Sequence, residues 1–309
     1  MPNGSTIQFR SGTYRIDDGI NLSNRSNLVL DGNGATLKAN GTASRPLDSV
    51  FALMYSSRQL TFRDFNLVGN NPNAGTVNAY GGGEGLHGFY VGGASDILIE
   101  DVSIRNFYGD CVYIGTDSGT TWSRNITFQD STCTGTGRHG VALIAGSNTL
   151  IQRVTFDQIG FMVVDIEPDR SAEGATDTVI RNNTVGSYGL TNRYIGWFVA
   201  AYAGAKGAPV RNLTISGNSV SGTSRLGYDG QAAAISIVVD GGVGPRSGIV
   251  ITGNASTRTV SRTDNGMPIL IKGADGVTIT GNKQPMSSGA FATVSGSSSV
   301  TNSGNDTSR

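Results

Sequence analysis

A seven-residue phrase recurs along this 309-residue chain and limits its possible folds more than any other feature. It reads Asn-Leu-Val-Leu-Asp-Gly-Asn at 27–33, Asn-Leu-Thr-Ile-Ser-Gly-Asn at 212–218 and Gly-Val-Thr-Ile-Thr-Gly-Asn at 276–282. Alternating apolar residues followed by a turn are typical of a short β-strand. The repeat therefore predicts a solenoid, in which each unit buries its apolar face only against its neighbours.

Further copies of the phrase lie 23 to 37 residues apart, and each is followed by a second short apolar run. Aligned on the fourth residue, nine side chains fall in register: Leu30, Phe62, Ile99, Phe128, Ile151, Ile180, Ile215, Ile251 and Ile279. Signals for two-residue hairpins are scarce, so consecutive strands are expected to pair one turn up and one turn down, in parallel. We predict an all-β fold, a right-handed parallel β-helix of about nine or ten coils.

The repeat runs without a break from about residue 27 to 282, so residues 1–309 are predicted to form a single domain. Residues 1–26 are expected to be an N-terminal cap or first coil, and residues 286–309 a fading C-terminal coil and tail. The 45 glycines suit many tight turns. The Asn-rich turns are expected to stack their side chains into ladders.

Charge and hydropathy narrow the range of partners. Lys plus Arg and Asp plus Glu balance at 23 each, so no nucleic-acid partner is expected. No apolar run approaches the roughly 18 residues that cross a bilayer, so no membrane partner is expected. The first residues carry no recognisable secretion signal. The two cysteines lack Cys-X-X-Cys spacing, and no metal site is predicted.

A dense acidic segment lies at Val164-Asp-Ile-Glu-Pro-Asp169. Strand alternation turns Val164 and Ile166 inward and places Asp165 and Glu167 outward, about 7 Å apart. Asp169 begins the following turn. A solvated acidic turn or a cation site is one interpretation. The other is an acid/base pair, because neighbouring like charges raise the pKa of one carboxyl.

Both histidines of the chain precede a glycine at the start of a predicted strand. By coil position, His87, Asp110, His139 and the Asp165/Glu167 pair are predicted to stack on four consecutive coils. Aromatic side chains are expected on the same face: Tyr90 and Tyr113 point outward, and Trp197 and Tyr202 lie one coil above the acidic pair. Such rings can stack on sugar faces, with ordinary packing as the alternative. Residues near 195–202 and 225–240 are expected to wall one side of the groove.

Four motifs appear in order, as Gly85-Leu86-His87-Gly88, Gly109-Asp110-Cys111, Arg138-His139-Gly140 and Asp165-Ile166-Glu167. They resemble the catalytic coils of polygalacturonase-like glycoside hydrolases, within the pectate-lyase-like β-helix superfamily. That family shows Asn-Thr-Asp-Gly, Asp-Asp-Cys, Gly-His-Gly and Arg-Ile-Lys, each on its own coil. Here His87 and Gly109 stand where that family has Asp, and Asp165 and Glu167 replace its basic pair.

The resemblance implies hydrolysis by carboxylates, one protonating the leaving oxygen and one activating water. The loss of the basic pair favours a neutral glycan over a polyuronate. The predicted catalytic residues are Asp110, His139, Asp165 and Glu167, with His139 as a hydrogen-bonding partner. The predicted substrate-binding residues are His87, Arg138, Tyr90, Tyr113, Asp169, Trp197 and Tyr202. The resemblance also implies a Cys111–Cys133 disulfide, with two buried free thiols as the alternative.

Three functions remain open at this point. The first is a polysaccharide-cleaving glycoside hydrolase without a cofactor. The second is a polysaccharide lyase or uronate epimerase, which would need Ca²⁺ or a cationic side chain to neutralise a uronate. The third is a non-catalytic phage tail-spike or adhesin shaft that binds glycan. A polysaccharide partner and an extracellular or virion-associated location are expected, with a monomer, or a homotrimer in the third case.

Overall fold

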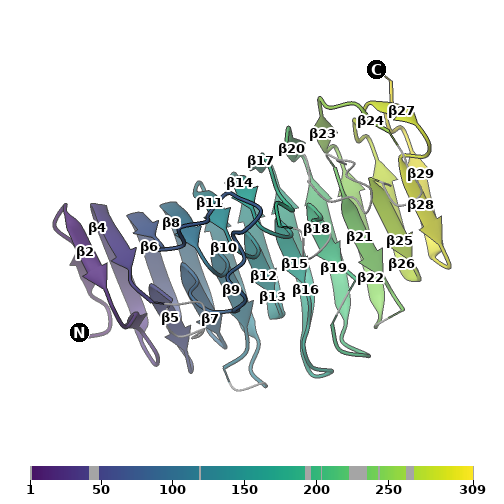
Figure 1. Cartoon of the computed structure of the whole chain (residues 1–309). Coiled ribbons are helices and arrows are strands. Elements are labelled where there is room, and N and C mark those ends of the chain that lie inside the picture. The colour runs from purple at the N-terminus through teal and green to yellow at the C-terminus, as the bar shows by residue number, and fades with distance from the viewer. Residues whose placement is uncertain are drawn as a thin grey trace.

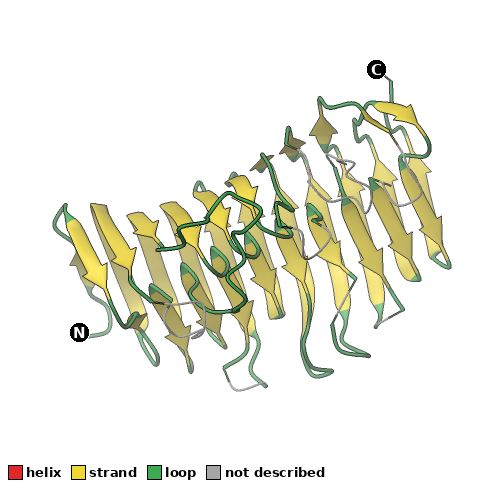
Figure 2. Ribbon diagram, viewed as in Figure 1, coloured by secondary structure: helices red, strands yellow, loops and turns green. Residues whose placement is uncertain are grey.

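The structure is a computed structural model that describes residues 2–41, 49–117, 120–191, 196–202, 204–222, 235–242, 244–261 and 268–308. Throughout these residues the regular structure is β-strand (Figure 2). The chain advances coil by coil from one end of a rod to the other, so the two termini lie at opposite ends (Figure 1). This confirms the predicted right-handed parallel β-helix.

Two long parallel sheets form the walls of the rod. The 17-stranded sheet A consists of β1 (Thr6–Gln8), β2 (Thr13–Ile16), β4 (Ser26–Ala39), β6 (Arg58–Val68), β8 (Ser95–Phe107), β10 (Ser123–Gln129), β11 (Thr132–Thr136), β13 (Ala145–Gln152), β14 (Thr155–Ile159), β16 (Gly174–Arg181), β17 (Thr184–Val185), β19 (Val210–Ser216), β20 (Ser219–Val220), β22 (Arg246–Thr252), β23 (Ala255–Ser256), β26 (Ala274–Thr280) and β29 (Ser298–Ser303). The 10-stranded sheet B consists of β3 (Ile20–Asn21), β5 (Phe51–Met54), β7 (Phe89–Gly92), β9 (Val112–Gly115), β12 (Val141–Leu143), β15 (Val164–Ile166), β18 (Val199–Ala201), β21 (Ile237–Asp240), β25 (Ile269–Lys272) and β28 (Ala292–Ser295). A small separate pair joins β24 (Val260–Ser261) to β27 (Met286–Ser288).

The register of sheet A is the one that the repeat predicts. Each of the nine aligned side chains is the pairing partner of the next, from Leu30 with Phe62 to Ile251 with Ile279. All nine are at most 1% exposed. The apolar runs of sheet B face them across the interior, so a single core extends along the rod. The fourth residue of each copy of the phrase therefore belongs to one buried row of side chains on sheet A.

Two left-handed backbone positions, five residues apart, bracket that strand in each coil. The first has φ between +51° and +64° at Asn27, Gln59, Asp96, Asn125, Asn148, Asp177, Asn212, Gly248, Gly276 and Ser299. The second has φ between +50° and +65° at Asp64, Asp101, Asp130, Arg153, Asn182, Gly217, Gly253, Gly281 and Gly304. Asn, Asp and Gly tolerate this conformation best, which explains why the phrase begins and ends with them.

The asparagine that closes the phrase forms the expected ladder. Asn183, Asn218, Asn254 and Asn282 are at most 1% exposed, and each donates its backbone N–H and side-chain amide to the side-chain oxygen of the next asparagine. Asn305 accepts the last pair of these bonds. The ladder satisfies polar groups inside the turn of each coil, where water is excluded.

The ends of the rod continue the same pattern. The strands β1 and β2 pair in parallel with β4, and β3 pairs with β5, so these N-terminal residues form a coil. At the other end β29 pairs with β26, but its residues are exposed and Asn302 takes the place of the buried isoleucine row. In the part of the chain that is described, no helix is long and apolar enough to span a membrane.

Candidate active site

One row of outward-facing positions crosses sheet B from coil to coil. Tyr90, Tyr113, Ala142, Asp165 and Ala200 are successive pairing partners on β7, β9, β12, β15 and β18. The rings of the first two stack with centroids 4.9 Å apart and planes within 5°. The expected outward orientation of both tyrosines and of Asp165 is thus present in the fold. The small Ala142 and Ala200 leave room on both sides of the carboxyl group.

The predicted His and Asp residues form a chain of contacts that ends at Asp165 in this row. His87 Nδ1 lies 3.1 Å from Asp110 Oδ2, the backbone N–H of His139 donates to Asp110 Oδ1 at 2.8 Å, and His139 Nε2 lies 3.2 Å from Asp165 Oδ2. The backbone N–H of Asp110 points at His87 Nδ1 from 3.0 Å. These contacts join four consecutive coils. Each of the four side chains is at most 5% exposed.

Gly109 explains the local departure from the resembled family. A Cβ at this position would lie 2.6 Å from His87 Nδ1 and 2.7 Å from the carbonyl oxygen of Gly85. The imidazole of His87 thus occupies the space that a side chain at 109 would need. The two substitutions belong together, because a histidine at 87 requires a glycine at 109.

Arg138 connects this buried group to the surface. Its Nε lies 3.9 Å from Asp110 Oδ1, and its Nη1 donates to the carbonyl oxygen of Glu84 at 3.3 Å and lies 3.9 Å from that residue's carboxylate. Burial alone would raise the pKa of Asp110. Arg138, His87 and His139 outweigh burial and hold this pKa far below its ordinary value. Asp110 is therefore a buried carboxylate that keeps its charge.

A cavity of about 170 Å³ opens over β12 and β15. Its polar lining consists of Glu84, Arg138, His139, Asp165 and Glu167. Its aromatic and apolar lining consists of Tyr80, Phe161, Met162 and Tyr202. The loop of residues 69–88, blue in Figure 1, crosses the front of the following coils and brings Tyr80 to within 5.0 Å of the Phe161 ring, centroid to centroid.

Burial sets the protonation states inside this cavity. Burial and the neighbouring Glu167 raise the pKa of Asp165 well above its ordinary value, which favours its protonated form. Burial and Asp169 raise the pKa of Glu167 as well. Burial lowers the pKa of His139 to about 3, so its imidazole is neutral. Burial thus favours the neutral form of both Asp165 and His139.

Several predicted site residues line the cavity, and others do not. Arg138, His139, Asp165, Glu167 and Tyr202 line it. His87 and Asp110 lie beneath the surface, at 1% and 0% exposure, where neither can touch a substrate.

Asp169 is exposed, and its pKa is raised by partial burial and by Glu173. Trp197 packs with Phe161, Met162, Ala200 and Val238 in an apolar cluster on the outside of sheet B. It is outside the lining of the cavity. Residues 225–234, expected to wall the groove, lie outside the described residues.

Tyr80, Glu84, Phe161 and Met162 line the cavity without having been predicted as site residues. Glu84 sits in the Gly81–Gly85 cluster, where the density of glycine signals only a turn. Tyr80 and Phe161 meet because the 69–88 loop reaches forward along the rod. This contact between Tyr80 and Phe161 could not be predicted from the repeat, because the loop is not part of it.

The predicted disulfide is present between Cys111 and Cys133, directly below the buried His and Asp residues. It joins the coil of β9 to the strand β11, and both cysteines are fully buried. Among the described residues, no group of three or more His, Cys, Asp or Glu side chains is arranged to hold a metal ion.

Known structures share the fold of this chain. No protein-family model and no curated protein matches its sequence. The A-module of the mannuronan C-5 epimerase AlgE4 from Azotobacter vinelandii is 13% identical with a TM-score of 0.54, over 97% of this chain and 90% of that one. The surface adhesin PfbA of Streptococcus pneumoniae is 12% identical with a TM-score of 0.55, over 98% and 85%. Endopolygalacturonase I of Stereum purpureum is 14% identical with a TM-score of 0.47, over 98% and 94%.

At 12% and 13% identity, the likenesses to the epimerase module and the adhesin concern the fold alone. They confirm the right-handed parallel β-helix fold.

Proposed function

We propose that this protein is a carbohydrate-active enzyme, a glycoside hydrolase that cleaves a polysaccharide in the cavity over β12 and β15. The observation that carries this proposal is the position of Asp165, which lines the cavity 3.2 Å from His139 Nε2 and next to Glu167. Burial and Glu167 raise the pKa of Asp165 well above its ordinary value, which favours the form that can donate a proton. Cleavage of a glycosidic bond needs a proton donor of this kind beside a second carboxylate.

In the proposed reaction Asp165 donates its proton to the leaving oxygen. The carboxylate that activates water is either Glu167 or Asp169, two and four residues after Asp165. His139 fixes the orientation of Asp165 from 3.2 Å. Asp110, which was predicted as catalytic, acts here as a positioning residue, because it is buried and accepts the backbone N–H of His139.

The charges of the cavity support a neutral sugar at the cleavage point. The carboxylates of Glu84 and Glu167 line it against a single cation, Arg138, which already faces the buried carboxylate of Asp110. A uronate carboxylate would meet net repulsion there. The rings of Tyr80, Phe161 and Tyr202 offer apolar area for the face of a sugar. The disulfide supports an extracellular or virion-associated location.

The test is to measure release of reducing ends from a panel of neutral and acidic polysaccharides. Asp165→Asn should lower kcat at least about 100-fold, the usual contribution of a general acid. Glu167→Gln and Asp169→Asn are compared with it, and the larger loss identifies the residue that activates water. Asp177→Asn is the matched control, because Asp177 is exposed on sheet A, where it accepts from Asn212. Unchanged turnover in Asp165→Asn would reject the proposal.

The same assays separate the alternatives. A lyase would release products with the absorbance of an unsaturated uronate, and an epimerase would convert uronates without cleavage. Binding without turnover on every glycan, together with a trimeric mass by light scattering, would favour a glycan-binding shaft over a monomeric enzyme.

A further inference from the structure

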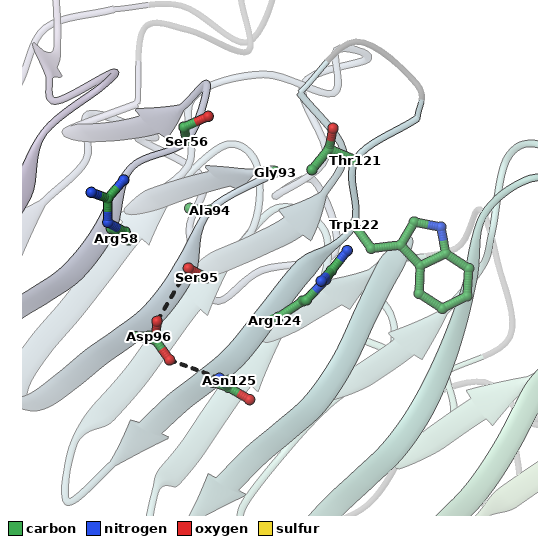
Figure 3. A pocket seen from close by; sticks show the side chains of 10 residues that line it. All are labelled: Ser56, Arg58, Gly93, Ala94, Ser95, Asp96, Thr121, Trp122, Arg124 and Asn125. Carbon is green, nitrogen blue, oxygen red and sulfur yellow. Dashed lines mark hydrogen bonds between the residues drawn. The ribbon is translucent and has the colours of Figure 1, made fainter.

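A second cavity, of about 380 Å³, lies on the outer side of sheet A at its edge with sheet B (Figure 3). Residues of β6, β8 and β10 form its floor, and Thr121 and Trp122 stand above it. It carries two arginines, Arg58 and Arg124, which rise on either side of Ala94 and Ser95 in Figure 3. None of these residues belongs to the acidic cavity.

The register of the strands brings the two arginines together. Arg58 and Arg124 are both pairing partners of Ser95, one on the coil before it and one on the coil after it. Their Cα atoms are therefore about 10 Å apart, two strand spacings. At two other places on the outer side of this sheet an arginine faces an acid on the adjacent coil: Arg63 faces Asp31 at 2.8 Å, and Arg153 faces Asp130 at 2.6 Å.

At this row the residue between the arginines is a serine. Among the described residues, neither Arg58 nor Arg124 makes a side-chain hydrogen bond or ion pair. Asp96 also lines the cavity, but its two oxygens accept from the Ser95 hydroxyl at 3.2 Å and the Asn125 amide at 2.7 Å. Two cations against one carboxylate leave the lining net positive. Arginine is the side chain best suited to hold a carboxylate or sulfate.

Trp122 borders the cavity on the side of Arg124, with its ring turned away from Arg58 (Figure 3). Its indole N–H donates to the carbonyl oxygen of Ala172 at 2.8 Å, and its ring edge lies against Gly174. Ala172 belongs to the loop that follows Glu167 and Asp169, so the two cavities are separated by one loop. An indole beside arginines and hydroxyl groups suits a ring that carries both an acid and hydroxyls, which describes an acidic sugar.

We propose that the Arg58–Arg124 cavity is a binding site for an acidic sugar residue, whose carboxylate or sulfate group the two arginines hold beside Trp122. It would anchor a polysaccharide through its acidic residues, away from the acidic cavity that repels them. The proposal concerns binding at a separate surface, so its test does not depend on catalysis.

Calorimetric titration provides the test, with an oligouronate, a sulfated oligosaccharide and a neutral oligosaccharide of the same length as probes. Arg58→Gln and Arg124→Gln should each weaken binding of an acidic probe at least about tenfold, and the double variant should abolish it. Added salt should weaken the same binding. Whichever acidic probe binds more tightly identifies the acid as a carboxylate or a sulfate.

Arg211→Gln is the matched control, because Arg211 is also exposed on sheet A, with Thr176 and Ser247 as its pairing partners. It should bind the acidic probes as the unmodified protein does. Failure of both acidic probes to bind, or binding unaffected by the double variant, would overturn the proposal. So would inorganic sulfate binding as tightly as the sulfated sugar, because the sugar ring would then contribute nothing.

Discussion

At the scale of single residues, burial and fixed charges decide which groups of the site are ionised. His139 and Asp165 lie 3.2 Å apart, yet burial favours the neutral form of each. Asp110 is equally buried and stays ionised, because Arg138 lies beside it and His87 and His139 lie on either side. The same residue type therefore supplies a proton donor at 165 and a fixed negative charge at 110.

The state of His139 can be measured directly, because the chain has only two histidines. Its pKa of about 3 in the folded protein lies below the ordinary 6.5. The folded state therefore binds fewer protons between these values, and this residue's contribution to stability falls as pH falls from 6.5 towards 3. ¹⁵N NMR of labelled histidine at pH 5 should show the signals of a neutral imidazole that His139→Gln removes. An imidazolium signal from His139 at pH 5 would contradict the assignment.

A second prediction concerns the buried charge of Asp110. Asp110→Asn should lower the free energy of unfolding by about 3 kcal/mol, because Arg138 loses its buried anionic partner. Urea denaturation measures this change. Asp130→Asn is the control, since it breaks the exposed ion pair with Arg153 and should change stability little. Equal effects of the two substitutions would show that Asp110 has no special electrostatic role.

At the scale of strands and coils, the sequence predicts the features that recur in every repeat. The row from Leu30 to Ile279, the outward tyrosines and the asparagine ladder follow from alternation and turn residues, because every coil solves the same packing problem. The burial of His87 and Asp110 does not follow, because it depends on Gly109 and on the stacked tyrosines above. The cavity does not follow either, since the 69–88 loop meets Phe161 through a contact that no period encodes.

The asparagine ladder should be strongest in its interior. Asn254→Ala removes the acceptor of two bonds from Asn218 and the side-chain amide that donates to the carbonyl oxygen of Ile215. The buried N–H groups of Asn218 are then left without this partner, for about 3 kcal/mol lost. Asn305→Ala should cost much less, because Asn305 ends the ladder and water can replace it. Thermal unfolding of the two variants, with matched circular dichroism spectra, tests this order. The reverse order would mean that the ladder is not the main contribution of these residues.

At the scale of the whole molecule, the strand pairings of sheets A and B join neighbouring coils, as β12 joins β9 and β15. Stability is therefore expected to be largely local along the rod. The Cys111–Cys133 disulfide adds a covalent link in the coils that carry the site. The candidate site is thus placed in coils that a covalent link joins, away from the two end coils of the rod.

Removal of that disulfide should therefore weaken the middle of the rod and leave its far end unchanged. In Cys111→Ala/Cys133→Ala, hydrogen exchange should show opening free energies lower by about 3 kcal/mol in β9, β11 and β12, the usual effect of losing a link that closes a loop of this size. Protection in β22 and β26 should remain as in the unmodified protein. An equal loss in all strands would show that the rod unfolds as one cooperative unit, and that the disulfide stabilises the whole molecule rather than the site.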